Sequence, residues 1–148
     1  MSDETQKERI DRELIELLNE LRVALPGVQV LFAFLLGIPF TNRFHEVDGS
    51  TEAMYIVALI ATAAASAFLM APTGLHRLRF RDPRKEEILF ESNRLVIVGL
   101  ALLALAIGSS VYVVASFLHG PWLGVVLAGG ITALIVALWF VQPLRERR

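Results

Sequence analysis

Residues 95–118 read LVIVGLALLALAIGSSVYVVASFL, a run of 24 residues that contains no Asp, Glu, Lys, Arg or His. A helix rises about 1.5 Å per residue and the hydrocarbon core of a bilayer is about 30 Å thick, so roughly 20 apolar residues cross it. Three further charge-free runs lie at residues 23–40, 53–71 and 122–141, and they are 18, 19 and 20 residues long. The pattern therefore predicts four transmembrane helices.

The composition of the whole chain supports the same fold class. Of its 148 residues 55% are hydrophobic, and the mean hydropathy is +0.57. A soluble domain of this length could not bury four helices that are apolar on every face. We therefore expect an all-α membrane protein, in which residues 1–22 form a cytoplasmic amphipathic helix and residues 23–148 form the four-helix transmembrane domain.

The basic residues are distributed unevenly over the segments that connect the four runs. Residues 1–22, residues 72–94 and the C-terminal tail hold thirteen of the fourteen Lys and Arg residues, and Arg43 is the remaining one. Because connections rich in Lys and Arg stay on the cytoplasmic side, this bias predicts that both termini are cytoplasmic. The expected location is the inner (plasma) membrane, as a multi-pass protein.

The segment before the first run has the spacing of an amphipathic helix. One helical face holds five apolar residues: Ile10, Leu14, Leu17, Leu18 and Leu21. Another face is rich in acidic residues, whereas helices that lie on a membrane surface usually carry a basic polar face. The pattern therefore favours a helix packed on other helices over a membrane-surface anchor.

The third helix is predicted to start well before its charge-free run. Asp82-Pro83 is a helix-start signal, and no breaker follows before Gly99, so one helix is expected from near Pro83 to about Leu118. Its first third would project beside the N-terminal helix, which would bring together six apolar residues. These are Ile88, Leu89 and Phe90 on one helix and Leu14, Leu17 and Leu18 on the other.

Two other boundaries are indicated by proline and glycine. The sequence Pro72-Thr73-Gly74 predicts the end of the helix that contains residues 53–71. The turn His119-Gly120-Pro121 is very short, so the last two helices are expected to form a tight antiparallel hairpin.

Three of the predicted helices carry small residues at helical spacing, which lets a neighbouring helix approach closely. The stripes are Ala63, Ala67 and Ala71; Ala101, Ala104 and Gly108; and Gly129, Ala133 and Ala137. They favour helix–helix contact, including contact between copies of the chain.

The first run contains residues that fit poorly in lipid, namely Pro26, Gly27 and Gln29. At about 100° per residue, one helical stripe holds Asn19, Arg22, Pro26, Gln29, Ala33 and Gly37. An unpaired amide is costly in hydrocarbon, and a proline leaves a backbone carbonyl of the preceding turn without its partner. The stripe is therefore expected to face protein or a water-filled cavity, and Pro26-Gly27 to kink or break the helix.

Two interpretations of this stripe remain open. It could belong to a structural network that holds the first helix on the third, or it could line a permeation or binding pathway. In either case polar residues at the cytoplasmic mouth of the two helices are expected to cluster. Those residues are Glu20, Arg22, Glu91, Asn93 and Arg94.

Three arginines, Arg77, Arg79 and Arg81, alternate just after the second run. Such residues usually set topology and contact lipid headgroups, and specific binding of an anionic lipid or partner is the alternative.

The sequence contains no pattern typical of a catalytic or cofactor site. It has no cysteine, no phosphate-binding loop and no zinc-protease motif. His45 and His119 could at most form a weak metal-ligand set with Glu46 or Asp48. We expect no enzymatic activity, no metal, no cofactor and no nucleic-acid partner; the expected partners are the lipid bilayer and further copies of the chain.

Two stretches carry a resemblance to a known family. They are NELRVALPGVQVLFAFLLGIPF at residues 19–40 and APTGLHRLRFRDP at residues 71–83. The chain resembles a family of small bacterial four-helix membrane proteins known only as a domain of unknown function, of which some members carry a sodium:proton antiporter label. Cation/proton exchange normally uses a carboxylate inside the membrane, and the four charge-free runs contain none.

Two functions are compatible with these features. The first is a homo-oligomeric channel or transport protein for ions or small solutes, because a single four-helix chain is too small to enclose a hydrated pore. Its candidate lining residues are Gln29, Thr62, Ser66 and Ser109. The alternative is a non-transporting membrane scaffold, accessory subunit or lipid-binding module.

Overall fold

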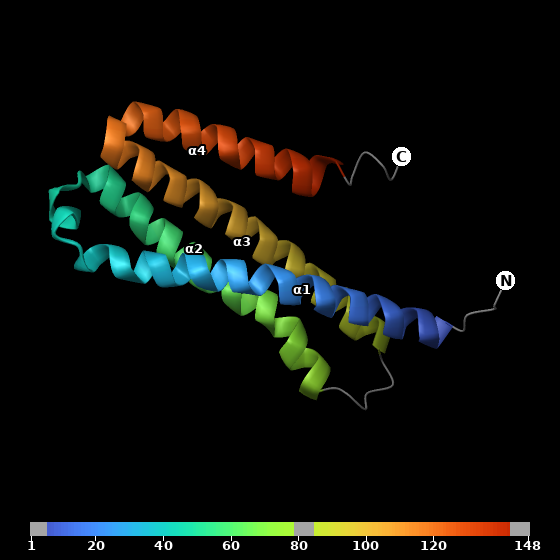
Figure 1. The fold of residues 1–148 in the computed structure, drawn as a ribbon. Helices are drawn as coiled ribbons and strands as arrows, with labels where there is room; N and C mark the ends of the chain where they lie inside the picture. The colour runs from blue at the N-terminus through green and yellow to red at the C-terminus, as the bar shows by residue number, and fades with distance from the viewer. Residues whose placement is uncertain (1–5, 79–84, 143–148) are drawn as a thin grey trace.

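Four long helices make up most of the computed structural model, which describes residues 6–78 and 85–142 (Figure 1). They are α1 (Gln6–Gly37), α2 (Gly49–Leu78), α3 (Lys85–His119) and α4 (Pro121–Val136). Two short 3-10 segments, η1 (Ile38–Phe40) and η2 (Asn42–Glu46), connect α1 to α2, and the π-helical segment η3 (Ala137–Val141) extends α4. The prediction of an all-helical fold is confirmed.

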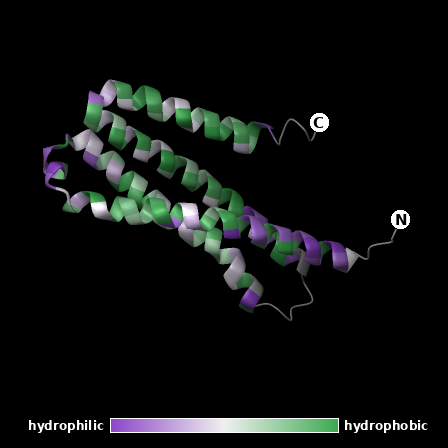
Figure 2. Ribbon diagram, viewed as in Figure 1, coloured by the Kyte–Doolittle hydropathy of each residue, from purple (hydrophilic) through white to green (hydrophobic). Residues whose placement is uncertain are grey.

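Within the described residues, four helices are long and apolar enough to cross a membrane. These candidate spans are Glu8–Phe40, Gly49–Leu75, Glu87–His119 and Pro121–Val141. Figure 2 shows hydrophobic residues along most of each helix and hydrophilic residues gathered in the N-terminal part of α1 and in the α1–α2 connection. The chain is therefore a small helical membrane protein, as its charge-free runs predict.

The helix α3 lies at the centre of the arrangement. Helix α2 packs along one side of α3 and α4 along another, whereas α1 crosses α2 and α3 (Figure 1). In the most apolar window of each span, the buried share is 44% in α3, 33% in α2, 11% in α1 and 6% in α4. The outer faces of α1 and α4 are thus available to lipid or to another chain.

We refer to the end of the bundle that holds the α1–α2 connection and the α3–α4 turn as the loop end. The end at which α1 and α3 begin is the extension end. At this end Leu17 of α1 lines one hollow together with Leu89 and Phe90 of α3. The N-terminal parts of the two helices therefore lie beside each other, as expected.

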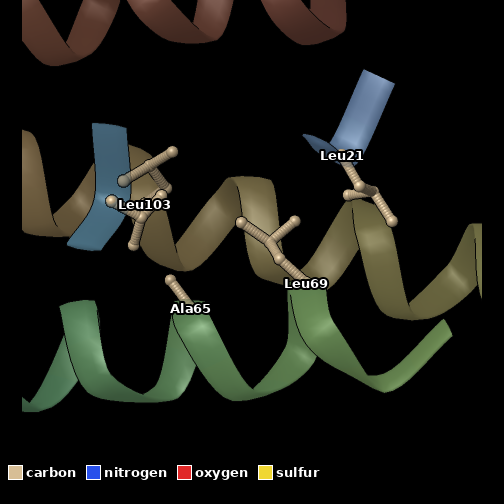
Figure 3. Close-up of a cluster of buried hydrophobic side chains, with 5 residues drawn as sticks. Leu21, Ala65, Leu69 and Leu103 are labelled. Carbon is tan, nitrogen blue, oxygen red and sulfur yellow. The ribbon is translucent and has the colours of Figure 1, made fainter. Parts of the chain in front are cut away.

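The core between α1, α2 and α3 consists of two apolar clusters. The first holds Leu21, Val28, Ala65, Leu69 and Leu103 (Figure 3). The second, nearer the loop end, holds Leu35, Tyr55, Ala58 and Val113. In a bilayer such clusters stabilise the fold through close packing, because lipid tails are as apolar as the side chains.

Helix α1 packs through a heptad pattern. Its buried residues are Leu14, Leu21, Val28 and Leu35, each seven positions after the last. This spacing keeps one face on the neighbouring helices when helices cross at a shallow angle. One continuous face thus joins the extension end to the loop end.

Of the two effects predicted for Pro26-Gly27, the break is wrong, because α1 continues through Pro26 as a single helix of 32 residues, and the kink stays a prediction. Pro26 and Gly27 are exposed, whereas Val28 beside them belongs to the heptad face. The packed face thus holds the helix together on both sides of the proline. Proline is tolerated in membrane helices where the surroundings can satisfy the freed carbonyl.

Helix α2 also extends beyond its predicted limits. It continues through Pro72 to Leu78 instead of stopping at residues 72–74. Pro72 is fully buried, so packing against the rest of the bundle offsets the backbone hydrogen bond that proline cannot make. At its other end α2 begins at Gly49, just after Asp48, whose side chain accepts a hydrogen bond from the Thr51 backbone N–H.

The expected long third helix and the hairpin are both confirmed. Helix α3 runs without interruption for 35 residues, although Asp82 and Pro83 lie outside the described residues. It ends at His119, and α4 begins two residues later at Pro121. Gly120 between them has φ +93°, a conformation that glycine adopts without a steric penalty.

The small-residue stripes pack differently from one helix to the next. On α3, Ala104 and Gly108 are buried and Gly108 faces Thr132 of α4, but Ala101 is exposed. On α2, Ala63 and Ala67 are exposed, and the helix instead buries a neighbouring stripe of Ala58, Ala61, Thr62 and Ala65.

The stripe on α4 is also exposed. It consists of Gly129, Ala133 and Ala137, and none of these residues is packed within the chain. The contact with α3 is made by Gly124, which lies against Tyr112 and Ser116, and by Thr132. Of the three predicted stripes, therefore, the one on α3 contributes to helix packing within one chain, through Ala104 and Gly108.

Candidate functional site

The polar stripe on α1 faces away from the bundle. All six of its residues are exposed: Asn19, Arg22, Pro26, Gln29, Ala33 and Gly37. They occupy a different side of the helix from the heptad face that packs on α2 and α3. In a single chain the stripe therefore meets no other helix, and only a further chain can bring protein against it.

The expected polar cluster is divided between two hollows at the extension end. Glu20 and Asn93 line the hollow between α1 and α3, which has a volume of about 390 Å³. Glu91 and Arg94 line a second hollow on α3, of about 700 Å³. Arg22 is exposed on α1 and is not among the residues that line either hollow.

The hollow between α1 and α3 is acidic. Besides Glu20 it is lined by Glu13 and Glu16. Both of these carboxylates pair within α1: the Arg9 Nε lies 2.9 Å from Glu13 Oε1, and the Arg12 Nε lies 3.8 Å from Glu16 Oε1. Exposed pairs at this spacing stabilise a helix by only about 0.3–0.5 kcal/mol, so their main effect is to reduce the local negative charge.

The described residues contain no group of three or more His, Cys, Asp or Glu side chains that could hold a metal ion. His45 is exposed in η2 and His119 is exposed at the end of α3. Of the three arginines after the second run, Arg77 is exposed in the last turns of α2, and Arg79 and Arg81 lie outside the described residues.

The hydroxyl groups in the middle of the bundle are directed at the backbone of their own helices. The hydroxyls of Thr62, Ser66 and Ser110 donate to the carbonyls four residues earlier, at 2.7, 2.9 and 2.7 Å. Such bonds satisfy the hydroxyl locally. Thr62 is fully buried, so it cannot line a pathway on the outer surface of the chain.

Ser109 differs from the other hydroxyl residues of the bundle. It is 2% exposed, and among the described residues its Oγ atom has no hydrogen-bond partner. A buried hydroxyl without a partner destabilises the fold modestly. Of the four candidate lining residues, Gln29 is the one that is exposed; Ser66 is half-buried.

A set of interhelical hydrogen bonds at the loop end was not predicted from the sequence. The Thr51 and Ser116 hydroxyls lie 2.9 Å apart, and the Ser50 and Tyr112 hydroxyls lie 3.0 Å apart. Both pairs join the first turn of α2 to the last turns of α3. These bonds could have been predicted from the sequence, because an antiparallel arrangement of α2 and α3 places the four hydroxyl residues at the same level of the membrane.

The helices and their sites define a class: a small four-span helical membrane protein whose exposed polar stripe lies on its first helix. The chain belongs to the family of unknown function DUF6328, which matches residues 3–143. The resemblance to an uncharacterised membrane-protein family is thereby confirmed. Comparison with curated proteins and with solved structures found no match.

Proposed function

We propose that the protein forms a homo-oligomer in the inner (plasma) membrane and that copies of α1 line a narrow pathway for ions or small solutes. The observation that carries this proposal is the exposure of the whole polar stripe of α1. In this arrangement both termini and the extension end lie in the cytoplasm, and the protein is not an enzyme.

The energetics of the first helix support an assembly. If Gln29 faced lipid, its amide would have no hydrogen-bond partner in the hydrocarbon. Pro26 has no N–H, so the carbonyl of Arg22 also lacks its usual helical partner. A second copy of α1, or water held between copies, supplies partners for both groups. The low burial of α1, 11% of its apolar window, leaves this face accessible.

The pathway in this proposal lies between copies and not inside one chain. The hydroxyls of Thr62 and Ser66 already donate to carbonyls of their own helix. The polar residues of the α1 stripe are Gln29 at membrane depth and Arg22 and Asn19 nearer the extension end. Repeated in every copy, Arg22 would form a ring, and rings of Arg favour anions over cations.

An uncoupled pathway fits the charge distribution better than cation/proton exchange. Exchange normally uses a carboxylate that can release a proton inside the membrane. The charge-free runs of the four spans hold no such group, and Glu20 and Glu91 lie at the extension end.

The second candidate is a non-transporting scaffold, accessory subunit or lipid-binding module. It is favoured by the charged extension of α1 and α3, which presents the hollows lined by Glu20 and by Glu91 and Arg94. In this case the stripe of α1 would meet a different membrane protein, and no flux would be observed.

The first experiment is the oligomeric mass of the full chain in lipid nanodiscs, measured by mass photometry or native mass spectrometry. A single defined oligomer is expected, and a monomer would overturn the proposal. Chloride and potassium flux into liposomes is then compared for wild type, Gln29→Leu and Arg22→Ala. We expect altered flux in both variants, and unchanged flux in the control Val30→Leu, which alters a 56% exposed apolar residue next to the stripe.

A further inference from the structure

A groove lies at the loop end between the α1–α2 connection and the last turns of α3. Its volume is about 390 Å³, which falls in the range of roughly 300–1,000 Å³ that is typical of small-molecule sites. Phe44 and Val47 form the wall on the connection, and Val114, Phe117 and Leu118 form the wall on α3. The groove is therefore apolar along most of its length.

The groove opens sideways, toward the surroundings of the helices. Val114 is 56% exposed, Phe117 42% and Leu118 62%, although all three belong to a candidate membrane span. The spans that flank the groove end at Phe40 and His119. The groove thus lies where the hydrocarbon of one leaflet meets the headgroup region.

The guanidinium group of Arg43 lies at this groove. Arg43 is the only Lys or Arg in residues 41–52, and its side chain is exposed. Its Cζ atom lies 6.0 Å from the centroid of the Phe117 ring, which places the guanidinium over the wall of the groove. It forms no ion pair with a carboxylate of the described residues.

The wall on the connection is held in place by the bundle. The Phe44 ring makes an edge contact with the Tyr55 ring, with centroids 4.9 Å apart. Tyr55 is buried on α2 and donates a hydrogen bond to the Leu35 carbonyl. The Thr41 hydroxyl donates to the Ile38 carbonyl at 2.8 Å. The groove is therefore preformed, which lowers the entropic cost of filling it.

We propose that this groove binds one anionic phospholipid, with an acyl chain between Phe44 and Val114 and the phosphate on the Arg43 guanidinium. An acyl chain matches the apolar walls, and a phosphate supplies an anion for Arg43, which has no ion pair among the described residues. An extended peptide fits poorly, because apolar walls would leave its backbone N–H and C=O groups without partners. The site uses residues outside the α1 stripe and is independent of the proposed function.

The test is native mass spectrometry of the full chain released from nanodiscs that contain equal amounts of phosphatidylglycerol and phosphatidylethanolamine. Wild type is expected to retain one phosphatidylglycerol per chain with a preference of roughly fivefold, the factor that one basic residue near a membrane surface supplies. Arg43→Gln should lose the preference, and Arg43→Lys should keep part of it.

Two further variants separate the groove from general charge effects. Val114→Trp fills the groove while Arg43 remains, and it should lose the retained lipid. Arg77→Gln removes an exposed arginine at the extension end, and it should retain the lipid as wild type does. Circular dichroism checks that each variant keeps its helical content.

Three outcomes would overturn the proposal. Wild type could retain the two lipids equally, Arg43→Gln could keep the preference for phosphatidylglycerol, or Val114→Trp could leave the bound lipid in place. A change in oligomeric mass for Val114→Trp, with lipid retention unchanged, would assign the groove to a second copy of the chain instead.

Discussion

The Tyr55 hydroxyl of α2 donates a 2.9 Å hydrogen bond to the backbone carbonyl of Leu35 in α1. In an uninterrupted helix this carbonyl would accept from the N–H of residue 39, but residue 39 is a proline and has no N–H. A side chain from another helix thus replaces a bond that the sequence of α1 removes. This hydrogen bond joins the end of the first span to the second, next to the apolar cluster of Leu35, Tyr55, Ala58 and Val113.

Replacement of Tyr55 by Phe tests this contact. The ring and its edge contact with Phe44 remain, but the Leu35 carbonyl loses the hydroxyl in a buried site. We expect the free energy of unfolding to fall by about 1–3 kcal/mol, measured by titration with sodium dodecyl sulfate in mixed micelles. The matched control is Tyr112→Phe, because the Ser50 hydroxyl that faces Tyr112 also donates to Asp48. A larger loss for Tyr112→Phe than for Tyr55→Phe would contradict the assignment.

The buried hydroxyl pair at the loop end makes a second prediction. Thr51 and Ser116 are 2% and 7% exposed and lie 2.9 Å apart. A double-mutant cycle of Thr51→Val and Ser116→Ala should give a coupling free energy of about 0.6 kcal/mol, and at most about 1.7 kcal/mol, the range found for such bonds in membranes. The cycle of Ser66→Ala with Ser116→Ala should give no coupling, since Ser66 donates within α2.

Asp48 should make stability depend on pH. The Thr51 backbone N–H and the Ser50 hydroxyl donate to Asp48 Oδ1 at 2.6 and 2.8 Å, and the pKa of Asp48 is lowered chiefly by the backbone bond and then by the hydroxyl. Because its pKa is lowered on folding, ionised Asp48 stabilises the folded state at pH values above its unfolded-state pKa of about 3.9. This stabilisation disappears as the pH falls through the folded-state pKa of Asp48.

The measurement is the thermal unfolding temperature in detergent from pH 7 to pH 2.5, for wild type and Asp48→Asn. The amide oxygen of asparagine still accepts at the helix start but does not titrate. The difference in unfolding temperature between the two proteins should therefore be constant above pH 5. At lower pH the unfolding temperature of wild type should fall relative to that of Asp48→Asn, as Asp48 is protonated. Parallel curves over the whole range would show that Asp48 contributes no pH dependence.

Because α2 and α3 approach closely at Gly99, adding one methyl group there should destabilise the fold. A Cβ atom at Gly99 would lie 2.8 Å from Cγ of Leu69, which is itself fully buried. Gly99→Ala should therefore lower the free energy of unfolding by about 1–3 kcal/mol, the usual cost of overpacking. Gly130→Ala on α4 is the control, since nothing lies within 4 Å of its Cβ position. It should be neutral or stabilising by up to about 1 kcal/mol, and a larger loss there than at Gly99 would refute the argument.

The sequence was sufficient to predict which residues share the α1 stripe, but not what this stripe faces in the folded chain. The spacing from Asn19 to Gly37 places six residues on one side of a helix whatever the helix packs against. This side faces outward because the heptad face from Leu14 to Leu35, on another side of α1, packs in the core instead. The residues of the predicted polar cluster lie on different sides of their helices, since Arg22 is on the outward side of α1 and Glu20 on the side toward Asn93. Their grouping stays a prediction.

The amino-acid sequence by itself determined the number of spans, the long third helix and the turn at Gly120, because length, charge and chain-breaking residues act locally. Only the tertiary structure decided which face of each helix is buried. Helix α2 offers two stripes of small residues, and α3 packs on Ala58 and Ala65 while Ala63 and Ala67 stay exposed. The same packing keeps α2 helical through Pro72. A lipid environment leaves apolar faces nearly equal in energy, so the choice among them depends on how closely neighbouring helices fit.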